Sequence, residues 1–315
     1  MTGYLIRRTA VLCGLLLFAS VLVFALMEVL PGDPAEIVLT HRQGGEPPSA
    51  AAVESLRKSW GLDRPTLTRF LDWMGGAVRG DFGISYATSD PVSSDLFESI
   101  GRTLVLALAA GLLVILLSLP WGLSAAARAG GWWDRLSLLL AAVLAATPVF
   151  VLGLVLVLVF ALVLGVLPAA GNDTLAHYVL PALTLGLVGT AMPARVLRRS
   201  LVDELEKSYI TAARARGAGR DRVLNAHALR NALLPWTTLV GLAFRGFLGG
   251  SVLVEAVFAF RGLGTYLVES VAQRDLPAVQ ASILVFVAVT VTVNFVTDVA
   301  CAALDPRLRL KGGAA

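Results

Sequence analysis

The sequence predicts an all-α integral membrane protein with six transmembrane helices, and three observations support this prediction. The 315 residues are 57% apolar and only 15% charged, with a mean hydropathy of +0.76, whereas soluble domains average about 25% charged residues. Apolar runs of about 20 residues, the length that crosses a bilayer as a helix, recur along the chain. No long stretch alternates apolar and polar residues as outer-membrane barrels do.

The first apolar run spans about Thr9–Leu30 and follows Arg7 and Arg8. It is longer than the core of a signal peptide, and no small-residue cleavage site follows it. We therefore expect residues 1–30 to form an uncleaved first transmembrane helix.

Residues 31–100 form one polar segment, which we expect to lie outside the membrane as a separate extracytoplasmic region. Ser49 suits the N-cap of a helix that reaches Trp60. Pro65 suits the start of a second helix that reaches Met74.

The remaining five spans are expected within a permease-like core at 101–304, followed by a short tail at 305–315. Their expected ranges are 103–127, 136–171, 179–195, 236–258 and 277–304. The run 136–171 is uncharged and longer than one span requires. A tilt, a bend at Thr147–Pro148 or an interfacial tail is therefore needed.

The distribution of basic residues predicts the orientation in the membrane. With six spans, both termini and two loops lie on one face, and that face carries sixteen Lys and Arg residues. The short loops of the opposite face carry only Arg261 and Arg274. By the positive-inside rule, both termini are cytoplasmic and 31–100 is extracytoplasmic.

The polar loop 196–235, between the fourth and fifth spans, has a helical rhythm. Ala212 and Ala213 favour a helix, and the segment Gly217-Ala218-Gly219 favours a turn. Asp221 suits the cap of a second helix that Pro235 would end. This pattern indicates a docking surface in the cytoplasm, whereas charge alone is equally typical of an ordinary basic loop.

Residue order distinguishes these alternatives through a resemblance. Ala212 and Ala213 followed by Gly217 resemble the core of the E-A-A-x-x-x-G loop of ABC-importer permeases, with Thr211 at the position of the Glu. The flanking residues Tyr209-Ile210 and 227–235 (HALRNALLP) resemble the dipeptide, oligopeptide and nickel branch of that family.

Three further motifs resemble the same branch in the expected order. They are L-P-G-D-P at 30–34, R-G-D-F-G-I-S-Y at 79–86 and D-P-R-L-R at 305–309. The second of these also predicts a turn followed by a short extended piece. The resemblance covers 30–309 and implies the type I permease fold of ABC importers.

The resemblance also implies the partners and the role of the loop. The loop would be the coupling helix that fits a groove on an ATPase subunit, with the coupling residues Tyr209, Thr211, Ala212, Ala213, Gly217, His227 and Arg230. The chain would pair with a second, homologous permease, two ATPase subunits and an extracytoplasmic solute-binding protein in the bacterial plasma membrane. ATP and Mg²⁺ would bind to the ATPase subunits, and this chain itself would hold no cofactor.

The residues support no enzymatic chemistry. No lysine follows a glycine, so the Gly-Lys-Ser/Thr of a P-loop is absent from the sequence. The three histidines and two cysteines have no metal-ligand spacing. The basic residues lie mostly beside spans, which argues against a nucleic-acid partner.

Two charged residues in the fifth span are candidates for the translocation pathway, because ionisable groups within a membrane are functional by default. Arg245 suits the carboxylate of a passing peptide, and Glu255 lies further along the same helix. The alternative role for Arg245 is a structural ion pair with a residue of a partner subunit.

Two other functions remain alternatives at this point. An ion-coupled secondary transporter would need carboxylates in its middle, for which Glu255 is the candidate. A membrane-anchored scaffold would need only one or two spans. Within the importer family, peptides, nickel chelates, glutathione and sugars are all open as substrates, and the permease pair is open as a homodimer or a heterodimer.

Overall fold

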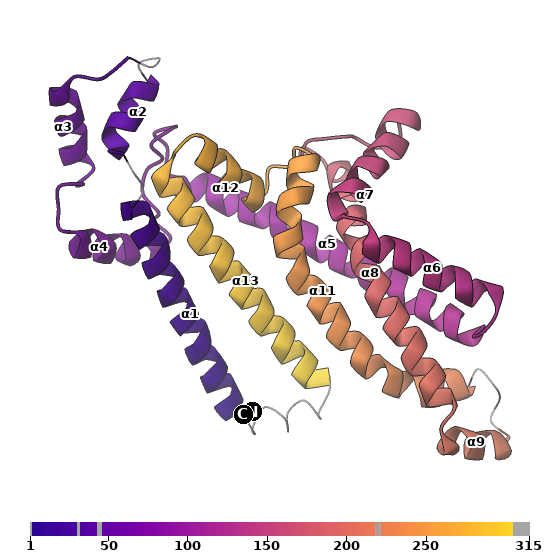
Figure 1. Cartoon of the computed structure of the whole chain (residues 1–315). Helices are drawn as coiled ribbons and strands as arrows, with labels where there is room; N and C mark the ends of the chain where they lie inside the picture. Colours follow the sequence, from indigo (N-terminus) through magenta and orange to yellow (C-terminus); the bar gives the residue numbers. More distant parts are fainter. Residues whose placement is uncertain (1, 30–31, 43–45, 218, 220–221, 305–315) are drawn as a thin grey trace. The chain divides into compact units, whose positions relative to one another are not determined.

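A computed structural model describes residues 2–29, 32–42, 46–217, 219 and 222–304. Inside helices, the side chains of 2–8, 27, 41–42, 213–214, 225–227 and 300–304 lie outside this description. Every regular element among the described residues is a helix, and one isolated bridge joins Ile84 and Pro91 (Figure 1). The predicted all-α fold class is confirmed.

Five described helices are long and apolar enough to cross a membrane, and a bent pair makes a sixth if it counts as one broken span. The five are α1 (Thr2–Val29), α5 (Val92–Ala127), α8 (Ala176–Leu205), α11 (Leu229–Val257) and α13 (Leu276–Leu304). The pair is α6 (Trp132–Ala146) with α7 (Val149–Leu156) and its π-helical continuation η1 (Val157–Val163), bent by 106°. The break falls at Thr147–Pro148, so the bend is observed among the three arrangements that the sequence left open. Proline at this position cannot donate a hydrogen bond to the preceding turn.

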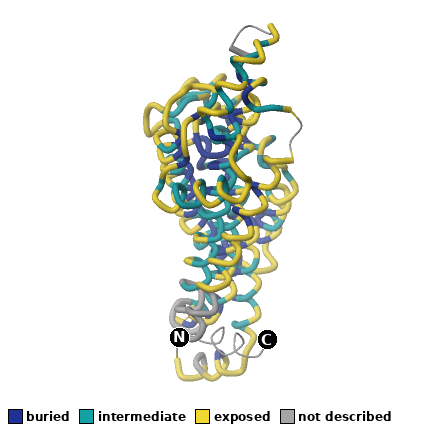
Figure 2. The backbone as a smooth tube through the Cα atoms, turned by 90° about the vertical axis from the view of Figure 1, so that its left-hand side faces the viewer, coloured by how far each residue is buried: buried dark blue, intermediate teal, exposed yellow. Residues whose placement is uncertain are grey.

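Large apolar side chains on the spanning helices are exposed, as a lipid-facing surface requires. Phe18 of α1 is 66% exposed and Leu108 of α5 is 61% exposed. In Figure 2 most of the backbone tube is exposed or intermediate, and buried residues are a minority. An apolar surface of this kind would promote aggregation in a water-soluble protein. In a membrane protein it contacts the acyl chains of the lipids.

The chain divides into two compact units. Unit 1 holds 103–261 and the end of α13 from Val293, and unit 2 holds 2–102 and 262–292. In unit 1, α8 packs against α6, α7 and α11 around fully buried leucines such as Leu180 and Leu197. Trp236 of α11 joins this core and donates its Nε1–H to Ser118 Oγ of α5 at 3.0 Å.

An ion pair between α6 and α8 lies at the start of the bent span. Arg198 donates from Nε to Asp134 Oδ1 at 2.8 Å and from Nη2 to Oδ2 at 2.6 Å. The Asp134 side chain is only 3% exposed, and it also accepts from the backbone N–H of Gly130 at 2.9 Å. This two-point contact fixes the direction in which α6 leaves the turn before it.

Unit 2 contains a cluster of short helices beside the ends of two spans. Its helices are α1, α2 (Pro34–Arg42), α3 (Ala50–Ser59), α4 (Thr66–Val78), α12 (Leu263–Ala272) and the first part of α13, together with the first turns of α5. Its core packs Phe82, Leu96 and Leu263 against small residues of α13. Phe24 of α1 meets Phe70 of α4 edge to face at 5.3 Å.

The segment between α4 and α5 is held down by Asp275, which lies at the turn between α12 and α13. Asp275 accepts from Ser85 Oγ and from the backbone N–H of Tyr86, the latter at 3.0 Å. The Tyr86 ring stacks on Trp60 with centroids 3.7 Å apart. Burial raises the pKa of Tyr86 to about 12, so this ring stays neutral at physiological pH.

The predicted helices in 31–100 are confirmed with one extension. Ser49 caps α3 by accepting from the N–H of Ala52 at 3.3 Å, and α3 ends before Trp60. Pro65 is the N-cap residue of α4, which continues past Met74 to Val78.

Two predictions are wrong, the end of a helix at Pro235 and a loop where α12 lies. Pro235 was expected to end a helix but lies inside α11. Proline removes only one backbone donor, and a chain entering the bilayer has no water for its remaining backbone groups, so the helix continues. The helix α12 was expected as a loop, because ten residues are too few to give a span signal.

Candidate functional site

The predicted docking loop contains a short helix, α9 (Ser208–Ala215), between the end of α8 and the π-helical turn η2 (Val223–Ala228) that leads into α11. Ile210 is fully buried and belongs to the core of unit 1. Thr211, Ala212 and Ala215 are exposed. One face of α9 is therefore anchored, and the other presents small side chains to the solvent.

A hydrogen-bond network at the start of α9 fixes it to both neighbouring helices. Tyr209 donates its hydroxyl to Glu204 Oε2 of α8 at 2.7 Å. Asn231 of α11 donates from Nδ2 to the Tyr209 hydroxyl at 3.2 Å and to Glu204 Oε2 at 3.4 Å. Lys207 forms an ion pair with the same carboxylate. Partial burial, with the hydrogen bond to Glu204 as the next cause, raises the pKa of Tyr209 above its ordinary value, so its hydroxyl remains a donor.

Gly217 ends the helix in a conformation that other residues avoid. Its φ is +84°, and a Cβ built on it meets no atom within 4 Å. The glycine is therefore needed for its backbone conformation and not for close packing.

The structure brings most of the predicted coupling residues together. Tyr209, Thr211 and Ala212 lie on α9, and Gly217 lies in the turn that follows. Arg230 is exposed in the first turn of α11. The side chains of Ala213 and His227 lie outside the described residues, as do 220 and 221 altogether.

Sequence reasoning missed the two residues that hold α9 in place, Glu204 and Asn231. Neither residue gave a local signal, because Asn231 is exposed and follows Arg230 in a stretch with other polar residues. Its partner lies 27 residues earlier in the chain, and only the fold brings the two together.

The candidate pathway residues both have partners within this chain. Glu255 of α11 is fully buried and accepts from Thr103 Oγ1 of α5 at 2.7 Å. Arg245 forms an ion pair with Asp298 of α13, and the two side chains are 35% and 14% exposed. The structural partner proposed for Arg245 was a residue of another subunit, and the observed partner belongs to the same chain.

Family models match nearly the whole chain. The model described as "Binding-protein-dependent transport system inner membrane component" matches 118–310, which includes α9 and the helices that hold it. The model of the N-terminal part of the same membrane components matches 1–107.

Individual relatives agree with the family models. The glutathione transport system permease protein GsiC of Escherichia coli K12 is 40% identical over 311 residues, which are 99% of this chain and 100% of that protein. GsiC of Shigella flexneri serotype 5b matches to the same extent. A solved inward-facing structure of the MetNI methionine ABC transporter is similar in fold, with a TM-score of 0.57 at 17% identity over 67% of this chain and 96% of that one.

These matches leave no support for an ion-coupled secondary transporter, and a scaffold with one or two spans does not fit the five or six candidate spans. They also agree with the absence of catalytic motifs from the sequence. The chain belongs to the binding-protein-dependent transport system inner membrane components and is a multi-pass, non-enzymatic permease subunit of an ABC importer.

Proposed function

We propose that this permease moves short peptides of the glutathione class into the cytoplasm, paired with a second, homologous permease and driven by two ATPase subunits that dock on the α9 helices. Importers of this family work with ATPase and binding-protein partners. The substrate class is supported by the whole-length similarity to permeases named for glutathione, a tripeptide. The binding protein would deliver the peptide on the extracytoplasmic face.

The exposed face of α9 is the observation that best supports the docking role. Thr211, Ala212 and Ala215 are small and exposed, while Ile210 is buried beneath them. Small residues allow a helix to approach the walls of a groove closely, as interior packing density requires. A merely solvated basic loop has no need of such a face or of the network that orients it.

Coupling follows from the anchoring of α9. Closure of the ATPase dimer on ATP would displace the docked helix. Because Tyr209 bonds to Glu204 of α8 and accepts from Asn231 of α11, the displacement reaches both spans. The spans then swing between inward-open and outward-open arrangements, with ATP and Mg²⁺ bound to the ATPase subunits.

Ala212→Glu tests this proposal in the complete complex in membrane vesicles. A carboxylate forced into a docking groove is buried without a partner and overpacks it. We expect ATPase affinity to fall by about tenfold or more, a change of at least ~1.4 kcal/mol. ATP-driven uptake of labelled glutathione, which unlabelled short peptides should compete, should be lost with it.

The same substitution at an exposed alanine of unit 2, Ala87→Glu, is the matched control for expression and ATPase binding. Arg222→Gln, an exposed residue beside η2, should also be mild. An Ala212→Glu complex that retained its ATPase subunits and transported normally would reduce the loop to a basic tether. Uptake without competition by peptides would reject the substrate class alone.

A further inference from the structure

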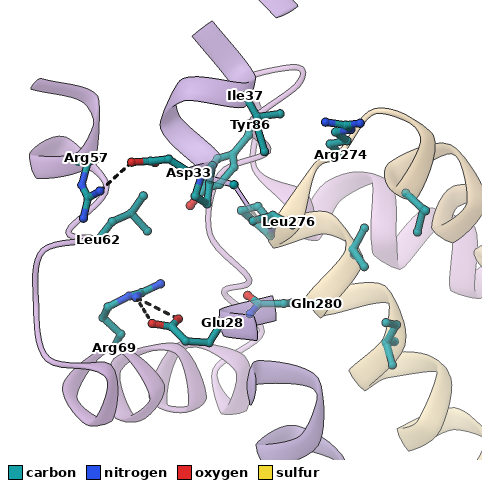
Figure 3. Close-up of a pocket in the computed structure, with 16 residues that line it drawn as sticks. Glu28, Asp33, Ile37, Arg57, Leu62, Arg69, Tyr86, Arg274, Leu276 and Gln280 are labelled. Carbon is teal, nitrogen blue, oxygen red and sulfur yellow. Dashed lines mark hydrogen bonds and ion pairs between the residues drawn. The ribbon is translucent and has the colours of Figure 1, made fainter. Parts of the chain in front are cut away.

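Unit 2 contains a cavity of about 910 Å³ between the ends of α1 and α13 and the short helices α2 to α4. Figure 3 shows its charged residues together with Leu276 and Gln280 of α13. Cavities of this volume commonly hold small ligands, with a few polar groups that fix the orientation of the ligand. The transport function assigns this cavity no role.

The ionised side chains that line the cavity have a net positive charge. Arg57 pairs with Asp33 at 2.7 Å, and Arg69 pairs with Glu28 at 3.0 Å (Figure 3). Arg274 also lines the cavity, is exposed, and forms no ion pair with any carboxylate of the described residues. The adjacent Asp275 is buried and bonded to Ser85 and Tyr86. The cavity therefore favours an anion.

The backbone at Arg274 shows that the turn does not select an arginine. Its φ is +54°, in the left-handed region immediately after α12. Glycine or asparagine is the usual residue at such a position. An arginine here carries a strain penalty, so its presence points to the guanidinium group and not to the turn.

The apolar wall of the cavity continues along α13. Leu276, Val279 and Ile283 line the cavity at spacings of three and four residues, which places them on one helix face. This stripe runs about 10 Å along the helix at 1.5 Å per residue. The apolar helix α13 begins at Leu276, and α1 ends at Val29, one residue after Glu28. The cavity thus lies where membrane meets water.

We propose that this cavity binds an anionic phospholipid, with the lipid phosphate at Arg274 and an acyl chain along the stripe of Leu276, Val279 and Ile283. A cationic group at the headgroup level above an apolar helix face matches both parts of such a lipid. A hydrophilic peptide would satisfy Arg274 but would leave the half-buried Leu276 and Ile283 of the stripe without an apolar partner. The inference is independent of the transported substrate.

Photolabelling of the complete complex tests the proposal. The complex is placed in nanodiscs of phosphatidylcholine that contain a trace of photoactivatable phosphatidylglycerol. We expect labelled peptides from 271–283, and we expect competition by phosphatidylglycerol but not by phosphatidylcholine or soluble glycerol phosphate. Arg274→Asn should reduce this labelling about tenfold through loss of a charge-assisted contact, and Arg274→Lys should retain most of it.

Asparagine suits the left-handed conformation, so Arg274→Asn should melt at or above the temperature of the unmodified complex. Arg274→Gln, compared with Arg274→Lys, answers the same question if the Asn variant fails to fold. Arg79→Asn, at an exposed arginine of unit 2 outside the cavity, should leave labelling unchanged.

Equal labelling of Arg274→Asn and the unmodified complex would overturn the proposal. Competition by glutathione or a dipeptide instead of phosphatidylglycerol would also overturn it, in favour of a substrate site.

Discussion

Arg245 and Asp298 form an ion pair within the membrane-spanning helices, and the surroundings of this pair remain polar. Among the described residues, Arg245 Nε and Asn294 Oδ1 are buried without a hydrogen-bond partner. Asn294 lies four residues before Asp298 and therefore on the same face of α13. The pair can stabilise the packing of α11 on α13, or it can hold Arg245 ready for a passing carboxylate.

A double-mutant cycle on Arg245→Gln and Asp298→Asn separates these two roles. Each single change leaves one charge unpaired in a low-dielectric setting, so we expect a loss of about 3 kcal/mol in the free energy of unfolding. The double change removes both charges and should recover most of that loss. Thermal unfolding of the purified complex measures the stability.

Uptake by the double variant then decides whether Arg245 contacts the substrate. If the pair is only structural, the stable double variant should transport every peptide as before. A stable double variant with altered peptide selectivity would place Arg245 in the pathway. Single variants that are as stable as the unmodified chain would show that the ion pair contributes nothing to the fold.

At the scale of elements, α9 depends on what surrounds it more than on its own sequence. Eight residues are too few to form a stable helix alone. The buried Ile210 and the bonds among Tyr209, Glu204 and Asn231 provide the stability that length does not. The turn at Gly217 then directs the chain toward η2.

Gly217→Val tests the importance of that turn. A β-branched side chain at positive φ costs about 1–2 kcal/mol or more, although no neighbouring atom obstructs it. We expect normal membrane insertion, with ATP hydrolysis that no longer drives uptake. Gly217→Asn is the matched control, because asparagine tolerates this conformation, and it should keep most of the coupling. Normal coupling in Gly217→Val would show that the turn is not required.

The elements that the sequence could predict are those with a strong local signal. Apolar length revealed the spans, and Pro148 marked the bend between α6 and α7. The short helix α12 and the continuation of α11 through Pro235 depend on neighbours and on the absence of water, which a local pattern does not contain.

The site shows the same division. The order of Ala212, Ala213 and Gly217 led to the proposed docking surface through its resemblance to a loop of ABC-importer permeases. The partners of Tyr209, Glu255 and Arg245 were not predictable, because they lie on other helices. In the sequence, Arg274 was only one of the basic residues of the short loops, because neither its φ nor the cavity that it lines can be read from the sequence.

For the whole molecule, the placement of both termini and of α9 in the cytoplasm stays a prediction from the distribution of basic residues. Single cysteines at Ser89 and Arg222, both exposed, should label oppositely in intact cells when Cys13 and Cys301 are replaced. An impermeant thiol reagent should reach the cysteine at position 89 and should reach that at 222 only after the membrane is permeabilised. Labelling in the opposite sense would reverse the orientation and place α9 out of reach of any ATPase.

The ion pair between Asp134 and Arg198 also imposes an order on the biosynthesis of the protein. Arg198 lies 64 residues after Asp134, so the pair cannot form until the ribosome has made most of α8. Until then the carboxylate has no cation from α8 and must stay hydrated, because an unpaired charge is costly in the bilayer. The contact that orients α6 therefore forms only after the helix that follows the bent span has been made.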